Sequence, residues 1–180
     1  FFRWLEHLTD PLPATQPGMP PASLIPFIVH YAWPFWPLLV ASAVFSTVIA
    51  ILEVTLFAFL GRLVDWLAAA EKVVFWAEHG DQLLSMGAVV LVVLPILKFI
   101  SEAIHNQGLL GNFAMRTRWQ AHRYLLRQSM EFYQNDFAGR VAAKMMQTAL
   151  AVRDIVMKIT EVLLYVAVYF TAAVVLFASS

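Results

Sequence analysis

The stretch NFAMRTRWQAHRYLLRQSMEFYQNDFAGRVAAKMMQTALAVRDIVMK, residues 112–158, decides the fold of this chain. It is polar, basic and patterned like a helix, and it lies between two apolar runs that are each long enough to cross a membrane. A loop that only joins two membrane spans needs few residues. We therefore expect two helical arms that leave the bilayer, meet at a knee over residues 132–140, and return. A solvated hairpin without a mechanical role is the alternative, because periodicity alone does not exclude it.

The composition places the rest of the chain in lipid. Of the 180 residues, 61% are hydrophobic and 13% are charged, whereas a soluble domain is typically about half apolar and about a quarter charged. The mean hydropathy is +0.70. The net charge of +0 provides no field that would recruit nucleic acid. The absence of cysteine excludes disulfides and thiolate metal sites. We expect an all-α membrane protein whose partner is the lipid bilayer.

Three apolar runs are candidate membrane spans, and they cover residues 35–60, 83–100 and 162–180. A helix that rises about 1.5 Å per residue needs roughly 20 residues to cross a hydrocarbon core of about 30 Å. The first and third runs meet this length. The second meets it if the helix extends to about residue 105, which brings Lys98 and Glu102 into or near the membrane.

The distribution of lysine and arginine predicts the orientation. The segment between the first two spans contains Arg62 and Lys72. The segment between the second and third spans contains Arg116, Arg118, Arg123, Arg127, Arg140, Lys144, Arg153 and Lys158. Because cytoplasmic segments carry the excess of basic residues, we expect the second segment and the N-terminus to be cytoplasmic. The basic arm is better explained by this topology and by anionic headgroups than by nucleic-acid binding.

The residues before the first span indicate a helix at the membrane surface. Residues 22–36 are rich in aromatic rings, which suit the headgroup level, and Pro34 and Pro37 suit a bend before the span. An early start of the first span is the alternative. Small residues at a spacing of four inside that span predict close helix packing, with a substrate-lining face as the alternative. They are Ser42, Ser46 and Ala50.

Each arm of the hairpin has an apolar line at spacings of three and four residues, which predicts an amphipathic helix. The outgoing arm has Met115, Trp119, His122, Leu126, Met130 and Tyr133. The return arm has Val141, Met145, Ala149, Val152, Val156 and Ile159. If the second span continues without a break to Phe132, about 50 residues give a rod of roughly 75 Å, longer than the bilayer core. We also expect Pro95 to kink this helix.

The knee combines aromatic and polar residues: Phe132, Tyr133, Gln134, Asn135, Asp136, Phe137, Gly139 and Arg140. Aromatic side chains fill pockets on partner proteins, so this tip is a candidate docking surface. Alternatively, the aromatic rings pack back onto the two arms. Physical reasoning on the residues leaves both open.

Three ionisable residues in or near the spans are candidates for a cavity: Glu53, Lys98 and Glu102. Charge in hydrocarbon is costly and usually faces a cavity or a partner. Lys98 and Glu102, four residues apart, are also placed for a pair within one helix. Glu53 either influences substrate choice or makes a structural hydrogen bond to a neighbouring helix. The five histidines are widely separated along the chain, so we expect no local metal site.

The order of these features resembles the membrane domain of ATP-binding cassette (ABC) exporters. The likeness is carried by Gly61-Arg62-Leu63-Val64-Asp65 after the first span and by Phe132-Tyr133-Gln134 with Gly139, Val141 and Lys144 at the knee. Val152-Arg153 follow as in the family. The chain departs from the family pattern at Gln134 and Thr148, where an acidic residue is common.

The resemblance implies that the knee, residues 132–140, is the first coupling helix and docks on a nucleotide-binding domain. It implies ATP and Mg²⁺ in that domain, and a second membrane domain as a homodimeric or heterodimeric partner, in a bacterial inner membrane. No Gly-x-x-x-x-Gly-Lys-Ser/Thr phosphate loop occurs in this sequence. We therefore expect no cofactor and no catalytic site in this chain, and ATP hydrolysis in the full-length protein.

On this reading the chain is a fragment of an ABC-exporter-type domain, truncated after the third span, with long cytoplasmic extensions. The expected segments are an N-terminal tail (1–21), an interfacial elbow helix (22–36), and a partial membrane domain (37–180). That domain divides into a first span (37–62), an outer loop (63–82), a second span (83–107) with an arm to 131, the knee (132–140), a return arm (141–160) and a third span (161–180). The alternative is a non-transporting membrane scaffold or signalling protein whose hairpin binds a partner.

Overall fold

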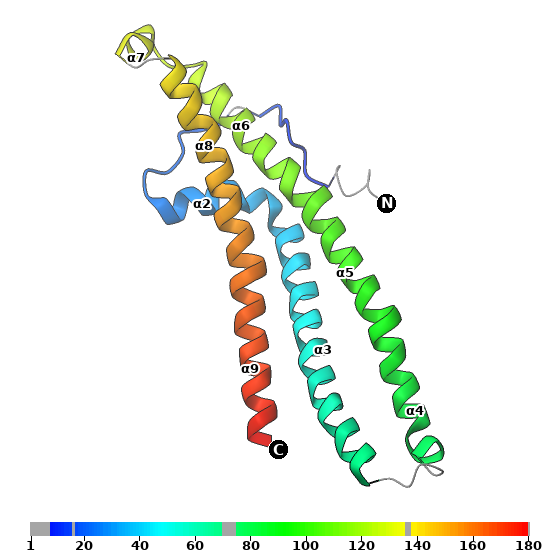
Figure 1. Cartoon of the computed structure of the whole chain (residues 1–180). Helices are drawn as coiled ribbons and strands as arrows, with labels where there is room; N and C mark the ends of the chain where they lie inside the picture. Colours follow the sequence, from blue (N-terminus) through cyan, green and yellow to red (C-terminus); the bar gives the residue numbers. More distant parts are fainter. Residues whose placement is uncertain (1–7, 16, 70–74, 136–137, 180) are drawn as a thin grey trace. The chain divides into compact units, whose positions relative to one another are not determined.

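The computed structural model describes residues 8–15, 17–69, 75–135 and 138–179, and all regular structure in these ranges is helical (Figure 1). The predicted all-α class is confirmed. The helices are α2 (Leu24–Ala32), α3 (Trp36–Ala69), α4 (Phe75–Ala88), α5 (Leu94–Ala103), α6 (Gly111–Leu125), α7 (Met130–Asn135), α8 (Ala138–Met157) and α9 (Leu164–Ser179). A 3₁₀ turn at Trp33–Phe35 joins α2 to α3.

Three continuous helices are long and apolar enough to cross a membrane: Leu24–Ala68, His79–Leu125 and Gly139–Ala178. Few residues in their most apolar stretches are buried within the chain, 22%, 6% and 0% in the three helices, which suits helices that face lipid. Together these helices indicate an integral membrane protein. π-helical turns join the α-helical parts, at Val89–Val93, Ile104–Leu110 and Lys158–Leu163.

The chain folds as two compact units. The first comprises Phe1–Ser42 and Ala103–Thr160, and the second comprises Ala43–Glu102 and Glu161–Ser180. The first unit holds the predicted elbow, hairpin arms and knee. The second holds the greater part of the apolar runs.

The core of the first unit is built on a pair of aromatic rings. Phe35 and Phe113 are fully buried and stack with their ring centroids 4.9 Å apart. Leu109 is fully buried on the same stretch of helix as Phe113. A Cβ atom at Gly108 would lie 3.3 Å from Leu38 Cδ1, so glycine permits the close approach of the start of α3. Around this core, α6 packs against α8, and α2 packs against α8.

The outgoing arm ends at Leu125, six residues before the predicted end at 131. Two backbone hydrogen bonds tighten the chain there, from Arg127 N to Tyr124 O and from Gln128 N to Leu125 O. Ser129 then starts α7, because its Oγ accepts a hydrogen bond from Phe132 N at 3.3 Å. The tip is therefore a separate short helix, and α6 does not extend as a rod to Phe132.

The apolar line predicted on the return arm is confirmed at its centre, where Ala149, Val152 and Val156 are buried. The outgoing arm is helical, but the line predicted on it is not its buried face. Its members Met115, Leu126 and Met130 are exposed, whereas α6 buries Phe113, Ala114 and Thr117. The buried face is rotated because the N-terminal segment and α8 cover a different side of α6.

In the second unit, α3 continues to Ala69, past the predicted end of the span at 62, and α4 begins at Phe75. One aromatic contact links the two helices beyond the predicted span, where the rings of Trp66 and His79 stack with centroids 4.1 Å apart. Within α3, Phe59 meets Trp66 edge to face. The helix also continues through Pro95, whose ring nitrogen has no hydrogen to donate, and a π-helical turn lies just before that proline.

The small-residue stripe on α3 takes part in packing, as its spacing predicts. Ser42 and Ala50 have no exposed surface, and Ser46 is half-buried. Side chains of this size let helix backbones approach closely.

Candidate functional site

A proline-rich stretch lies along α6 in the first unit. We call residues 8–15 and 17–21 the N-terminal segment. Arg116 donates to Asp10 O at 2.7 Å, and Trp119 Nε1 donates to Pro13 O at 3.1 Å. Arg123 donates to Ala14 O at 2.8 Å and to Pro13 O at 3.2 Å. Arg127 donates to Pro17 O.

The chemistry of both partners explains this arrangement. Prolines 11, 13, 17, 20 and 21 have no backbone N–H, so the N-terminal segment presents mainly carbonyl acceptors. Side chains three to four residues apart on a helix share one face, and here that face offers guanidinium and indole donors. The Arg123 guanidinium also lies 5.7 Å from the centroid of the Trp119 ring, within cation–π range.

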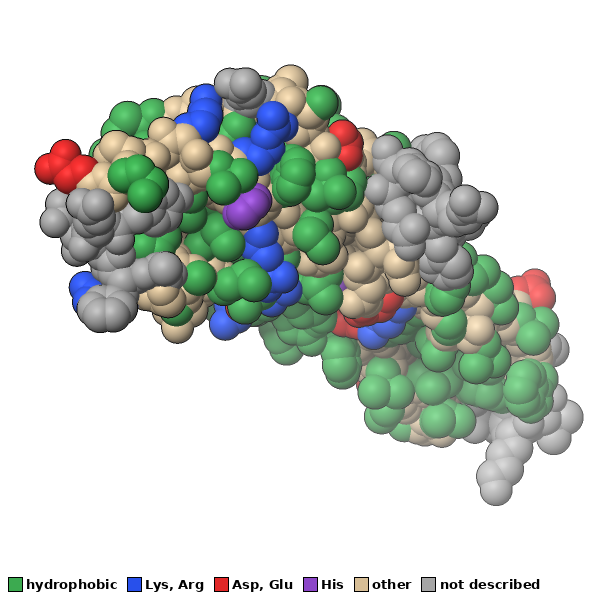
Figure 2. Space-filling view, turned by 90° about the horizontal axis from the view of Figure 1, so that it is seen from above, with side chains coloured by type: hydrophobic (Ala, Val, Ile, Leu, Met, Phe, Trp, Pro, Cys, Tyr) green, Lys and Arg blue, Asp and Glu red, His purple; other side chains and the backbone are tan. Residues whose placement is uncertain are grey.

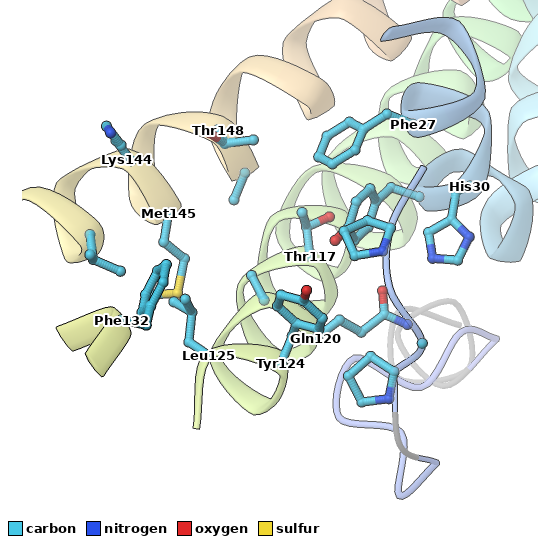
Figure 3. Close-up of a pocket in the computed structure, with 17 residues that line it drawn as sticks. Phe27, His30, Thr117, Gln120, Tyr124, Leu125, Phe132, Lys144, Met145 and Thr148 are labelled. Atoms are coloured by element: carbon cyan, nitrogen blue, oxygen red, sulfur yellow. The ribbon is translucent and has the colours of Figure 1, made fainter. Parts of the chain in front are cut away.

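The N-terminal segment closes one side of a cavity of about 350 Å³ in the first unit (Figure 3). Phe27 and Tyr31 of α2 contribute rings that meet edge to face with centroids 4.9 Å apart. Leu125, Phe132 and Met145 form an apolar end. Polar groups also line the cavity, from Thr117, Gln120 and Tyr124 on α6 and from Lys144 and Thr148 on α8.

The predicted docking tip lies at α7 and at the start of α8, and Figure 1 shows α7 beyond the ends of α6 and α8. The sequence leaves open whether the aromatic rings of the tip form a docking surface or pack back onto the arms. Phe132 is compatible with both, since it is 38% exposed and also lines the cavity behind the tip. Gly139 and Arg140 are exposed in the first turn of α8. In the view from above, basic side chains lie among apolar ones (Figure 2).

Part of the predicted tip is not described in full. Tyr133, Gln134 and Asn135 belong to α7, but only their backbone is described. Asp136 and Phe137 lie outside the described residues. The docking role of all these residues stays a prediction.

A polar cluster joins three helices of the second unit. Glu53 of α3 forms an ion pair with Lys98 of α5, with Glu53 Oε1 and Lys98 Nζ 2.8 Å apart. The hydroxyl of Tyr165 on α9 donates a hydrogen bond to the other carboxylate oxygen of Glu53. Glu53 is thus the common partner of two other helices, as the structural reading of this residue predicts.

Two cavities meet at Glu53. One, of about 660 Å³, is lined by apolar side chains of α3 and of the helix around Leu94, and by Tyr165 and Tyr169. The other, of about 330 Å³, is lined by Glu53, Lys98, Ser101, Glu102 and Tyr165, among others. The three ionisable residues selected from the sequence therefore line one cavity. Glu53 thus lines a cavity and also bonds to two other helices, and its influence on substrate choice stays a prediction.

Sequence reasoning missed Tyr165 and the role of the arginines on α6. A tyrosine in an apolar run carries no distinctive pattern. The arginines fit the topology rule, which assigns them no partner within the chain. The run of prolines at the N-terminus was the available signal, because carbonyl groups without neighbouring N–H groups need donors elsewhere. Within the ranges that the structure describes, no group of three or more metal-ligating side chains occurs.

The comparisons with known proteins agree with the general family assignment. The chain is similar to an "Uncharacterized ABC transporter ATP-binding protein" of Haemophilus influenzae, with 41% identity over 178 residues. The match covers 98% of this chain and 29% of the relative, so the chain spans less than a third of the relative's length. No family model matches the chain. No solved structure matches it. The chain is thus a homologue of part of an ABC transporter protein.

Proposed function

We propose that this chain is part of the substrate-translocating membrane domain of an ATP-driven exporter. In this role it couples the motion of a nucleotide-binding domain to alternating access of a membrane cavity. The observation that carries the proposal is the 41% identity along nearly the whole chain to an ABC transporter protein, in a chain with three helices able to span a membrane.

The tip formed by α7 and the start of α8 is the proposed contact with the nucleotide-binding domain. It is short and compact, and its exposed apolar and basic side chains include Met130, Phe132 and Arg140. A surface of this kind fits a pocket on a partner, because a few aromatic and arginine side chains often carry most of the binding energy. The two helices on either side, α6 and α8, pack on each other and would move together.

The N-terminal segment adds a further contact to the pair of helices α6 and α8. Its carbonyl groups accept from Arg116, Trp119 and Arg123 on α6 and from Arg127 just past the end of α6, in the direction of the tip. The helices α6 and α8 can transmit the motion of a nucleotide-binding domain only if they bend little. The hydrogen-bonded segment stiffens α6 on the side that α8 does not cover.

Photocrosslinking in the full-length protein that carries this chain tests the coupling role. A benzophenone amino acid replaces Arg140 at the tip or, as a matched control, Ile159, which is 52% exposed farther along the chain. We expect the probe at position 140 to crosslink to the nucleotide-binding domain, with a yield that changes on addition of ATP and Mg²⁺. The probe at position 159 should give no such product.

Crosslinks from position 140 that reach only unrelated proteins, with no response to nucleotide, would contradict the exporter function. They would favour a membrane scaffold whose hairpin binds a partner.

A further inference from the structure

We propose that the larger cavity beside Glu53 binds an organic monocation that carries apolar, aromatic groups. The inference rests on the proposed function for its biological meaning, because it names the class of substrate that the membrane cavity would accept. The site itself is argued from the second unit alone.

The size and the walls of the cavity fit an apolar molecule. Its volume is about 660 Å³, within the range of about 300–1,000 Å³ typical of small-molecule sites. Leucine, valine and phenylalanine side chains, including Phe57, Phe59 and Leu94, form most of the wall. An ion with a tight hydration shell would lose its water here without replacement.

The charge of the lining selects the sign of the ligand. Among the described residues that line the cavity, Glu53 is the one with a side chain that is charged at neutral pH. Tyr165 and Tyr169 add two rings, stacked with centroids 5.8 Å apart. The face of an aromatic ring attracts cations. A carboxylate beside tyrosine rings therefore favours a cation and disfavours an anion of the same shape.

Lys98 does not occupy this cavity, but its ammonium group competes with a bound cation for the carboxylate of Glu53. Its ammonium group pairs with Glu53 Oε1 and lines the smaller cavity, whereas it is not among the residues lining the larger one. A carboxylate has about four acceptor positions, and Lys98 and Tyr165 occupy two of them. A cation in the larger cavity would share Glu53 with Lys98 or displace it, and the Lys98 side chain is exposed enough to move, at 57%.

This competition predicts opposite effects for the two partners of one ion pair. Glu53→Gln keeps an oxygen for Tyr165 but removes the charge, so cation binding should weaken. Lys98→Met removes the competing ammonium group while keeping the length of the side chain, so cation binding should become tighter. If the ion pair only stabilised the fold, both substitutions would change the affinity for the cation in the same direction.

The test measures binding of tetraphenylphosphonium to the full-length protein in nanodiscs without nucleotide, after subtraction of binding to empty nanodiscs. Tetraphenylborate, which has the same shape and the opposite charge, is the companion probe. We expect saturable tetraphenylphosphonium binding that weakens about tenfold in Glu53→Gln and tightens about threefold in Lys98→Met. Asp65→Asn, which removes a carboxylate from the same helix but outside this cavity, should leave it unchanged.

The proposal is overturned if tetraphenylphosphonium shows no saturable binding, if Glu53→Gln binds it as the native protein does, or if tetraphenylborate binds equally well. It is also overturned if Glu53→Gln and Lys98→Met weaken tetraphenylphosphonium binding to the same extent. These outcomes leave the exporter function standing, because crosslinking at the tip decides that function without reference to this cavity.

Discussion

Phe113 shows how much one side chain contributes to the first unit. It is fully buried and stacked on Phe35. Phe113→Ala removes the ring and leaves a space that the two surrounding helices cannot close. We expect a loss of about 3–5 kcal/mol in the free energy of unfolding, measured as a lower midpoint of thermal unfolding in detergent.

Met130→Ala is the control for that prediction. Met130 is 75% exposed in α7, so its replacement should change the free energy of unfolding by less than about 0.5 kcal/mol. Equal effects at the two positions would show that the stacked rings are not the core of this unit.

Glu53 is the residue where stability and function should separate. Glu53→Gln loses the ion pair with Lys98, but the amide oxygen can still accept from Tyr165. We expect the free energy of unfolding to fall by about 1 kcal/mol, whereas ATP-dependent export by the full-length protein should change in rate or in substrate range. Unchanged export of every substrate tested would assign Glu53 to packing alone.

At the scale of elements, the contact between the N-terminal segment and α6 depends most on Arg123. Its guanidinium donates to the carbonyls of Pro13 and Ala14 and lies over the Trp119 ring. Arg123→Gln should release the segment, because a shorter neutral amide does not replace these contacts. We expect proteinase K to cut between residues 8 and 21 about tenfold faster, with the cleavage products identified by mass spectrometry.

Arg153→Gln is the matched control for that experiment. Arg153 also donates through its guanidinium group, but to the carboxylate of its neighbour Asp154 on α8, with 2.7 Å between Nη2 and Oδ1. Its loss should not change cleavage of the N-terminal segment. A segment that is equally resistant in both variants would mean that the other donors hold it without Arg123.

The elements also show which features a sequence can predict. The return arm was predicted because Ala149, Val152 and Val156 form a local apolar line, and this line is buried. The buried face of α6 was not predicted, because its position depends on elements distant in sequence. The same limit applies to Lys98. A local pair with Glu102 could be predicted from the spacing, but the ion pair with Glu53, 45 positions earlier on another helix, could not.

At the scale of the whole molecule, the proposed tip belongs to the first unit and the proposed cation site belongs to the second. The helix His79–Leu125 contributes Lys98 to the polar cluster around Glu53 in the second unit. It contributes Arg123 to the contact with the N-terminal segment in the first unit. The proposed cation site and the arm that leads to the proposed tip therefore share one continuous helix, which ends at Leu125, before α7. A change at either end has a covalent route to the other.

The orientation of the chain in the membrane decides whether the tip can reach a cytoplasmic nucleotide-binding domain. Residues 1–180 contain no cysteine, so a cysteine introduced here can be labelled by itself once any cysteines elsewhere in the full-length protein have been replaced. With Asp81→Cys, an impermeant maleimide should label intact cells, because residue 81 lies in the loop predicted to be outside. With Arg140→Cys, labelling should require permeabilised cells. Labelling of position 140 in intact cells would reverse the topology, and the tip would then face away from any source of ATP in the cytoplasm.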